Sequence, residues 1–197
     1  DVIVAVCDAP VKYTHPDLAD AMWVNEAEAN GIKGVDDDGN EYIDDIHGYN
    51  FYKSGKSNGA INWDVSGETG HGTHVAGIVA AVNGNGIGIS SIAGGSGNGD
   101  GVRIMNCQVF EGGNPGGDRE MSNAIMYAAD NGACIAQCSY GNSFAITDDD
   151  TYINGGKMNY EGKEIDVDGS PLENAALRYF LDPANSNHES LEGNIAV

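Results

Sequence analysis

Residues 103–110 (RIMNCQVF) and 133–138 (ACIAQC) are two short apolar runs, and the segment between them, 119–131, has the spacing of a helix. A run that is apolar at almost every position is typical of a strand buried on both faces. Alternation of nearly continuous apolar strands with helices indicates a parallel sheet. The helix carries its apolar residues on one face, at Met121, Ile125, Ala128 and Ala129.

The same alternation continues on both sides of this unit. Residues 2–7 (VIVAVC) predict a buried strand, 47–51 (HGYNF) a weaker one, and 194–197 the start of another. Residues 71–82 and 172–181 have helical spacing. Together these elements predict an α/β fold, a parallel sheet with helices on both faces. In such sheets, active sites lie at the carboxyl ends of the strands.

The connections between these elements are long and polar. Residues 25–46, 52–70, 83–101 and 142–171 are rich in Gly, Asn, Asp and Ser. Loops of this length in a compact domain are usually functional, or are held by a ligand such as a metal ion. With no internal repeat and no linker, residues 1–197 are expected to belong to one domain. Because the last residues fall inside an expected strand, we expect a longer domain whose sheet is incomplete here at the C-terminus.

Charge excludes several classes of function. The chain has 9 Lys and Arg against 30 Asp and Glu, a net charge of −21. A nucleic-acid-binding protein needs a basic face that displaces counterions, and nine cations among 30 anions do not make one. Binding to anionic lipid surfaces is disfavoured for the same reason. No apolar run approaches the ~20 residues of a membrane span. The hydrophobic fraction of 41% argues against a disordered chain. We therefore expect neither a nucleic-acid partner nor a membrane span.

The cysteines are too few for a disulfide framework in a chain of this length. Each lies in or beside an apolar stretch, which favours small buried side chains. A zinc site made of four cysteines needs closely spaced pairs, and only the last two come near that spacing. The cysteines therefore do not indicate whether the protein works in an oxidising or a reducing compartment. They are Cys7, Cys107, Cys134 and Cys138.

Two polar residues lie where a parallel sheet usually places catalytic side chains. Asp8 directly follows the first expected strand, although an Asp there can also serve as a turn or cap residue. His71 lies between two glycines at the start of an expected helix, where a substrate backbone can approach closely. The positive end of the helix disfavours imidazolium and keeps the imidazole available as a base. His71 and His74 could alternatively form a zinc pair, but no third ligand with a recognised spacing follows.

Three blocks of sequence, in their order, resemble the subtilisin-like serine peptidases, the subtilases. They are residues 3–8 (IVAVCD), 15–18 (HPDL) and 71–77 (HGTHVAG). The resemblance implies the subtilisin fold and an Asp-His-Ser triad, with Asp8 as the orienting carboxylate and His71 as the general base. The nucleophilic serine in its Gly-Thr-Ser-Met-Ala context and the oxyanion asparagine in its Ala-Gly-Asn context do not occur in these 197 residues. The chain alone is therefore expected to be inactive.

The resemblance also implies where a peptide binds. Subtilases add the substrate as a strand between two enzyme segments. Glycines in these segments leave room for a peptide backbone, and Tyr140 is expected to line a specificity pocket. The matching residues are Gly112 and Gly113 in one segment and Ser139, Tyr140 and Gly141 in the other.

One position departs from the family pattern. Asp8 is followed by Ala9 and Pro10, where subtilases usually have Ser or Thr and then Gly. A hydroxyl that would ordinarily hydrogen-bond the carboxylate is therefore missing, and Pro10 removes a backbone N–H. The departure is compatible with the fold but leaves a catalytically dead homologue as an alternative.

Residues 36–45 (DDDGNEYIDD) contain five aspartates, one glutamate and one asparagine, without a Lys or Arg. Carboxylates so close together repel one another unless a cation lies among them, and alternating oxygen ligands suit calcium better than magnesium. The loop resembles an EF-hand loop without being one, since Glu41 replaces the usual Gly and His47 the last Glu. A solvated acidic loop is the alternative. The expected ligands are Asp36, Asp38, Asn40, the Tyr42 carbonyl, and Asp44 or Asp45.

The resemblance implies a second calcium site. Many subtilases bind calcium with a loop after the histidine helix and with the Asp of the HPDL block. A glycine-rich turn without metal is the alternative. The matching residues, which would act mostly through carbonyl oxygens, are Asp17, Val82, Asn83, Asn85, Ile87 and Ile89.

The predicted function is a calcium-binding serine endopeptidase of the subtilisin type that acts on peptides or proteins. Its own pro-segment is a second candidate partner. Two other classes stay open, an inactive subtilase-like binding or scaffold domain and an unrelated metal-binding α/β module. High acidity and calcium ligands favour a secreted, periplasmic or cell-surface protein, because calcium is scarce in the cytosol.

Overall fold

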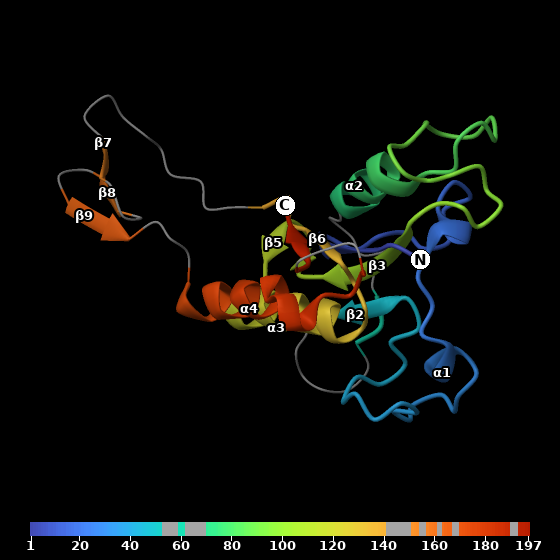
Figure 1. Ribbon diagram of the computed structural model, residues 1–197, viewed down its shortest axis with the longest axis horizontal. Coiled ribbons are helices and arrows are strands. Elements are labelled where there is room, and N and C mark those ends of the chain that lie inside the picture. The colour runs from blue at the N-terminus through green and yellow to red at the C-terminus, as the bar shows by residue number, and fades with distance from the viewer. Residues whose placement is uncertain are drawn as a thin grey trace.

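The computed structural model describes residues 1–52, 59–61, 70–140, 151–153, 157–160, 163–166, 170–189 and 193–197, with the backbone alone in 151–166. The central sheet consists of β1 (Ile3–Asp8), β2 (Gly48–Asn50), β3 (Arg103–Gln108), β6 (Ile135–Gln137) and β10 (Ile195–Ala196). Its strands are all parallel and lie in the order β10-β6-β1-β3-β2 (Figure 1). β1 is therefore the middle strand, and its last residue, Asp8, pairs with Gln108 of β3.

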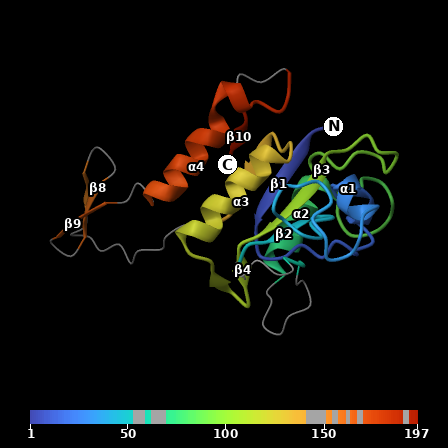
Figure 2. The same ribbon diagram turned by 90° about the horizontal axis from the view of Figure 1, so that it is seen from below.

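Helices cover both faces of this sheet, as the strand–helix alternation predicts (Figures 1 and 2). The covering helices are α2 (His71–Ala80) on one face and α3 (Asp118–Asp130) and α4 (Pro171–Leu181) on the other. Successive side chains of β1 point to opposite faces. Ala5 and Cys7 belong to the core beneath α3 and α4, whereas Val4 and Val6 belong to the core beneath α2.

The predicted apolar face of α3 is the face that packs on the sheet. Ile125, Ala128 and Ala129 are buried in the core, and Met121 packs against its border. The following helix on this face, α4, begins with a proline and is capped by Ser170, whose Oγ accepts a hydrogen bond from the N–H of Glu173 at 3.1 Å. Periodicity and cap chemistry together explain why this layer forms.

The long connection 142–171 contains regular structure that the sequence does not predict. Three antiparallel strands form a separate small sheet there, and Figure 1 shows this sheet apart from the parallel one. The prediction of an irregular loop is therefore wrong for this stretch. The strands are β7 (Thr151–Ile153), β8 (Lys157–Tyr160) and β9 (Lys163–Asp166).

The remaining elements are short. β4 and β5 pair as a hairpin directly after β3. Within the described residues, no helix has the length and apolar character needed to cross a bilayer. These short elements are η1 (Ala19–Ala21), α1 (Glu26–Ala29), β4 (Phe110–Glu111), β5 (Asn114–Pro115) and η2 (Pro183–Asn185).

Candidate active site

Asp8 and His71 lie side by side at the carboxyl edge of the sheet. Asp8 is the last residue of β1, and His71 is the first residue of α2. Nδ1 of His71 is 2.7 Å from Oδ1 of Asp8, which is a hydrogen-bond distance. The Asp8 side chain is 2% exposed, whereas that of His71 is 52% exposed. The two residues singled out in the sequence thus form a buried acid that holds an accessible imidazole.

The start of α2 fits tightly against the chain that leaves β1. A Cβ atom at Gly72 would overlap the carbonyl oxygen of Ala9, so only glycine permits this approach. The next residue, Thr73, accepts a hydrogen bond from the backbone N–H of Lys12 at 2.9 Å. This close contact sets the position of the imidazole relative to the carboxylate.

One oxygen of the Asp8 carboxylate makes both contacts that define its position. Oδ1 accepts a hydrogen bond from the N–H of Ala9 at 2.7 Å as well as the one from His71. Oδ2 is buried, and no described residue offers it a hydrogen bond. Alanine at position 9 has no hydroxyl to donate. When Nδ1 of His71 donates to Asp8, the neutral ring presents Nε2 as its acceptor, as a general base requires.

The first expected peptide-binding segment is the turn of the β4–β5 hairpin. Gly112 and Gly113 form this turn with φ values of 57° and 79°, which favour glycine. Phe110 in β4 contacts Tyr140 after β6, with ring centroids 5.6 Å apart. Because β3 and β6 flank β1, the two segments lie on either side of the strand that ends in Asp8.

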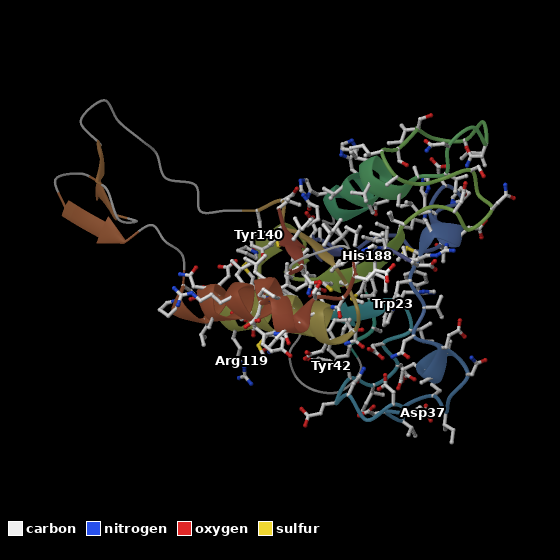
Figure 3. All side chains as sticks on the ribbon, in the orientation of Figure 1. Trp23, Asp37, Tyr42, Arg119, Tyr140 and His188 are labelled. Carbon is white, nitrogen blue, oxygen red and sulfur yellow. The ribbon has the colours of Figure 1, made fainter. Side chains whose placement is uncertain are left out.

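The second expected segment begins directly after β6. Oγ of Ser139 accepts a hydrogen bond from Nε2 of Gln137 at 2.9 Å, and the Ser139 side chain is exposed. The hydroxyl of Tyr140 is buried, and this burial raises its pKa. Figure 3 shows Tyr140 between the end of the sheet and α4. Gly141 lies outside the described residues.

The acidic loop brings three carboxylates together, although not the set that its spacing predicts. One carboxylate oxygen from each of Glu28, Asp38 and Asp45 lies within 4.8 Å of the other two. Asp45 is 0% exposed and Glu28 is 4% exposed. No described Lys or Arg forms an ion pair with these three residues. Three oxygens so close together, two of them on buried side chains, are a donor set that suits a hard cation.

Glu28 lies outside the acidic run, on the short helix α1, and no local pattern predicts its role. Its Oε1 accepts a hydrogen bond from the N–H of Asp37 at 2.6 Å, and its Oε2 accepts one from the N–H of Asp44 at 2.8 Å. One buried carboxylate therefore holds two points of the loop. Only folding α1 against the loop brings it there.

Other expected ligands of this loop hold its backbone. Asp36 accepts hydrogen bonds from three N–H groups, and Asp44 accepts one from Gly34 at 3.0 Å. Desolvation alone would raise the pKa of Asp36, but the hydrogen bonds from the N–H groups of Glu41, Gly39 and Asn40 hold this pKa below its ordinary value.

Asn40 and Tyr42 contact each other, because the Tyr42 N–H donates to Oδ1 of Asn40 at 2.7 Å. The Asn40 amide nitrogen lies 3.1 Å from Oδ2 of Asp38 and 3.2 Å from Oδ2 of Asp45. Among the predicted carboxylate ligands, the structure thus places Asp38 and Asp45 in the cluster.

Burial shapes the electrostatics of this cluster. It raises the pKa of Asp45, although hydrogen bonds from Tyr127 and Asn40 oppose the rise. Burial and the nearby Asp45 carboxylate raise the pKa of Tyr127 well above its ordinary value. Burial likewise raises the pKa of Tyr42 to about 12. Both tyrosines therefore stay neutral at ordinary pH, and a cation would offset the cost of burying the acids.

The structure also brings Asp17 to the loop after α2. Its side chain is 2% exposed and accepts hydrogen bonds from the Asn85 amide at 2.7 Å and from the N–H of Ile89 at 3.2 Å. Its carbonyl oxygen accepts one from the N–H of Val82 at 3.2 Å. The remaining expected ligands, Asn83 and Ile87, lie on the same loop.

Comparison with known protein families matches residues 1–191 to the subtilase family. The chain is a subtilase. Subtilisin-like protease 1 of Plasmodium vivax is 31% identical to this subtilase over 190 residues, which cover 95% of the chain and 25% of the Plasmodium protein. The thermophilic serine proteinase of Bacillus sp. (strain AK1) is 32% identical over 138 residues, which cover 70% of the chain and 25% of that protein. This subtilase thus spans about a quarter of the length of both relatives.

Solved structures show the same fold. Fervidolysin from Fervidobacterium pennivorans, described as a keratinolytic enzyme related to subtilisin, superposes with a TM-score of 0.51 at 24% identity, over 91% of this subtilase and 19% of that chain. The nisin leader peptidase NisP from Lactococcus lactis superposes with a TM-score of 0.50 at 22% identity, over 99% of this subtilase and 42% of that chain. The parallel sheet with helices on both faces is thus the subtilisin-like arrangement.

Proposed function

We propose that this subtilase is a serine endopeptidase that hydrolyses peptide bonds through an Asp-His-Ser triad. The observation that carries the proposal is the 2.7 Å contact between Nδ1 of His71 and Oδ1 of Asp8 at the carboxyl edge of a parallel sheet. Membership of the subtilase family supports it. Residues 1–197 contain no serine in the family's nucleophile context. The proposal therefore places the nucleophile elsewhere in a longer protein, and residues 1–197 alone are inactive.

His71 is the general base and Asp8 its orienting partner. Nε2 of His71 takes the proton of the serine hydroxyl while the serine oxygen bonds to the scissile carbonyl carbon. The carbon–nitrogen bond then breaks, and the imidazolium returns the proton to the leaving amine. Water repeats the sequence on the acyl-enzyme and releases the acid. Throughout, Asp8 keeps Nδ1 protonated and stabilises the imidazolium, and its burial strengthens that interaction.

The substrate is an extended peptide that lies between the two segments flanking β1. Gly112 and Gly113 bear no side chains that would block a backbone, and Ser139 and Tyr140 form the opposite side. Backbone hydrogen bonds of this kind give affinity for many sequences, while pockets for side chains give specificity. The protein's own pro-segment is a second partner for the same surface.

The test of this proposal is carried out on the full-length protein. His71→Ala should lower kcat on a peptide substrate by about 10⁴-fold or more, because no other group takes the serine proton. His74→Gln is the matched control, since His74 is an exposed histidine on the same helix. It should keep most of the activity. Near-normal turnover in His71→Ala would refute the assignment.

Calcium is the cofactor that the acidic cluster fits. Glu28, Asp38 and Asp45 would hold one ion, and the Asp17 side chain with the loop at 82–89 would hold another. A bound ion would supply the positive charge that offsets the buried carboxylates and would fix the loop before β2. Its role here is structural, since the cluster lies on the loop rather than beside His71.

A location outside the cytosol fits both the proposed peptidase and its proposed calcium sites, because calcium is abundant there. The halolysin-like extracellular serine protease Nep of Natrialba magadii is 29% identical to this subtilase over 141 residues, 72% of the chain and 21% of that protein. Detection of the protein in culture medium or at the cell surface, against a cytosolic marker, checks this location.

One observation favours a second candidate, an inactive subtilase-like domain that binds peptides without cleaving them. Oδ2 of Asp8 is buried without a partner among the described residues, next to an alanine that offers no hydroxyl. Labelling of the full-length protein with a fluorophosphonate serine probe separates the two. Stoichiometric labelling that His71→Ala abolishes supports the peptidase, whereas no labelling together with retained peptide binding supports the binding domain.

A further inference from the structure

Tyr127 connects the acidic cluster to the core of the protein. Its hydroxyl donates a hydrogen bond to Oδ2 of Asp45 over 2.5 Å. The two residues are 1% and 0% exposed. Tyr127 lies on α3, 82 positions away along the chain from Asp45. A helix that covers the sheet thus supplies a polar atom to a loop that lies before β2.

Aromatic packing holds Tyr127 in this position. Its ring meets that of Tyr42, from the acidic loop, edge-on with centroids 4.8 Å apart. It also meets the ring of Phe51 edge-on at 5.4 Å. In Figure 3, Tyr42 lies toward α3, while Asp37 lies at the outer end of the loop. Tyr127 therefore touches the loop twice, through its hydroxyl and through its ring.

The other hydrogen-bond partners of Asp45 are side-chain amides that also donate to Asp38. The side-chain amides of Asn25 and Asn40 each donate to Asp45, at 3.0 and 3.2 Å, and each also donates to Oδ2 of Asp38. These amides lie between the two carboxylates, where a cation would compete with them. Tyr127 approaches Asp45 from the core instead. Each carboxylate oxygen has two lone pairs, so Asp45 can accept from the hydroxyl and still bind a cation.

We infer that Tyr127 is a positioning residue for the calcium site formed by Glu28, Asp38 and Asp45. The inference rests on the calcium site proposed above and adds α3 to it. Tyr127 orients the Asp45 carboxylate before the ion arrives, and ion binding in turn ties α3 to the loop. Partners that orient metal ligands typically change metal affinity 10–100-fold when removed.

The test uses the full-length protein and calcium itself. Tyr127→Phe keeps the ring and removes the hydroxyl. Tyr179→Phe is the matched control, because the Tyr179 hydroxyl on α4 donates to Oδ1 of Asp130 on α3 at 2.7 Å in an exposed pair. Asp45→Asn identifies which calcium-binding event belongs to the cluster. Calcium affinity is measured by isothermal titration calorimetry, and Tm is measured with millimolar calcium and with excess chelator.

The expected result is a Kd for the cluster's event that is about tenfold higher in Tyr127→Phe and unchanged in Tyr179→Phe. Tm of Tyr127→Phe should fall more in calcium than in chelator. An unchanged Kd, with Tm lowered equally in both conditions, would show that Tyr127 serves packing alone and overturn the inference. If Asp45→Asn removes no calcium-binding event, the calcium site itself is wrong and the inference fails with it.

Discussion

Gly72 lies so close to Ala9 that any side chain at position 72 would overlap the carbonyl oxygen of Ala9. This contact is where the first turn of α2 meets the chain leaving β1, immediately beside the Asp8–His71 pair. The geometry of the pair therefore depends on a residue that has no functional group.

Gly72→Ala should separate the base from its carboxylate. The added methyl group forces the helix start away from Ala9, so kcat of the full-length enzyme should fall at least tenfold and Tm should also fall. Gly77→Ala is the control on the same helix, since its Cβ would meet only Ile89 Cδ1 at 3.7 Å, an ordinary contact. It should leave kcat unchanged and hold or raise Tm, because alanine is the better helix former. Equal loss of activity in both variants would contradict this account.

Calcium should stabilise the protein through Asp38 more than through Asp36. Tm in saturating calcium should be about 5 °C or more above Tm in excess chelator, because a ligand that binds only the folded state stabilises that state. Asp38→Asn should shrink that difference, because Asp38 belongs to the carboxylate cluster. Asp36→Asn should lower Tm similarly in both conditions, because Asp36 holds backbone N–H groups. Thermal unfolding followed by circular dichroism checks this, and a calcium effect that only Asp36→Asn removes would reverse the assignment.

Asp100 should contribute stability that is lost in acid. A backbone hydrogen bond from Ser96 lowers the pKa of Asp100 below its ordinary value of 3.8. A carboxyl group with a lowered pKa in the folded state stabilises that state above pH 3.8 and loses this contribution as pH falls through the folded-state pKa. Asp100→Asn should therefore show a smaller drop in Tm between pH 6 and pH 3 than the wild type. Ser96→Ala keeps the backbone donor but removes the Ser96 hydroxyl, which donates to Oδ1 of Asp100 at 3.2 Å, so its drop in Tm should lie between those of the wild type and Asp100→Asn. Identical pH profiles for wild type and Asp100→Asn would exclude the effect.

Ala9→Ser should stabilise the Asp8 carboxylate. A hydroxyl at position 9 could donate to Oδ2 of Asp8, which is buried and has no partner among the described residues. Satisfying a buried acceptor of this kind is worth about 1 kcal/mol or more, so Tm should rise by a few degrees. Ala9→Val adds more bulk than serine and no donor, and should lower Tm. A serine variant no more stable than the valine variant would show that the hydroxyl does not reach the carboxylate.

The sequence predicts the layers of the fold because their causes are local. Apolar runs such as 103–110 and 133–138 specify buried strands, and the face containing Ile125 and Ala128 specifies how α3 packs. Asp8 could be singled out because it ends a buried strand, and His71 because it lies between glycines at a helix start; the resemblance to subtilases then implies their roles.

Contacts between distant segments cannot be predicted in this way. Glu28 enters the acidic cluster only when α1 folds back on the loop, and Tyr127 reaches Asp45 only once α3 covers the sheet. The strands β7, β8 and β9 have three or four residues each, so the alternation in 157–160 (KMNY) is too short to indicate a strand. Local patterns report burial and periodicity, whereas these features depend on the assembled fold.

The central place of β1 has a consequence for how the protein folds. Its first residue, Ile3, pairs with Arg103, and its other edge pairs with β6, where Val4 lies opposite Ile135. During synthesis, β1 therefore leaves the ribosome about a hundred residues before either neighbour exists. Pairings so distant in sequence are slow to form, and the apolar side chains of β1 stay exposed until they do. Pairing of β1 with β3 and β6 completes both cores, because the two faces of β1 belong to one core each.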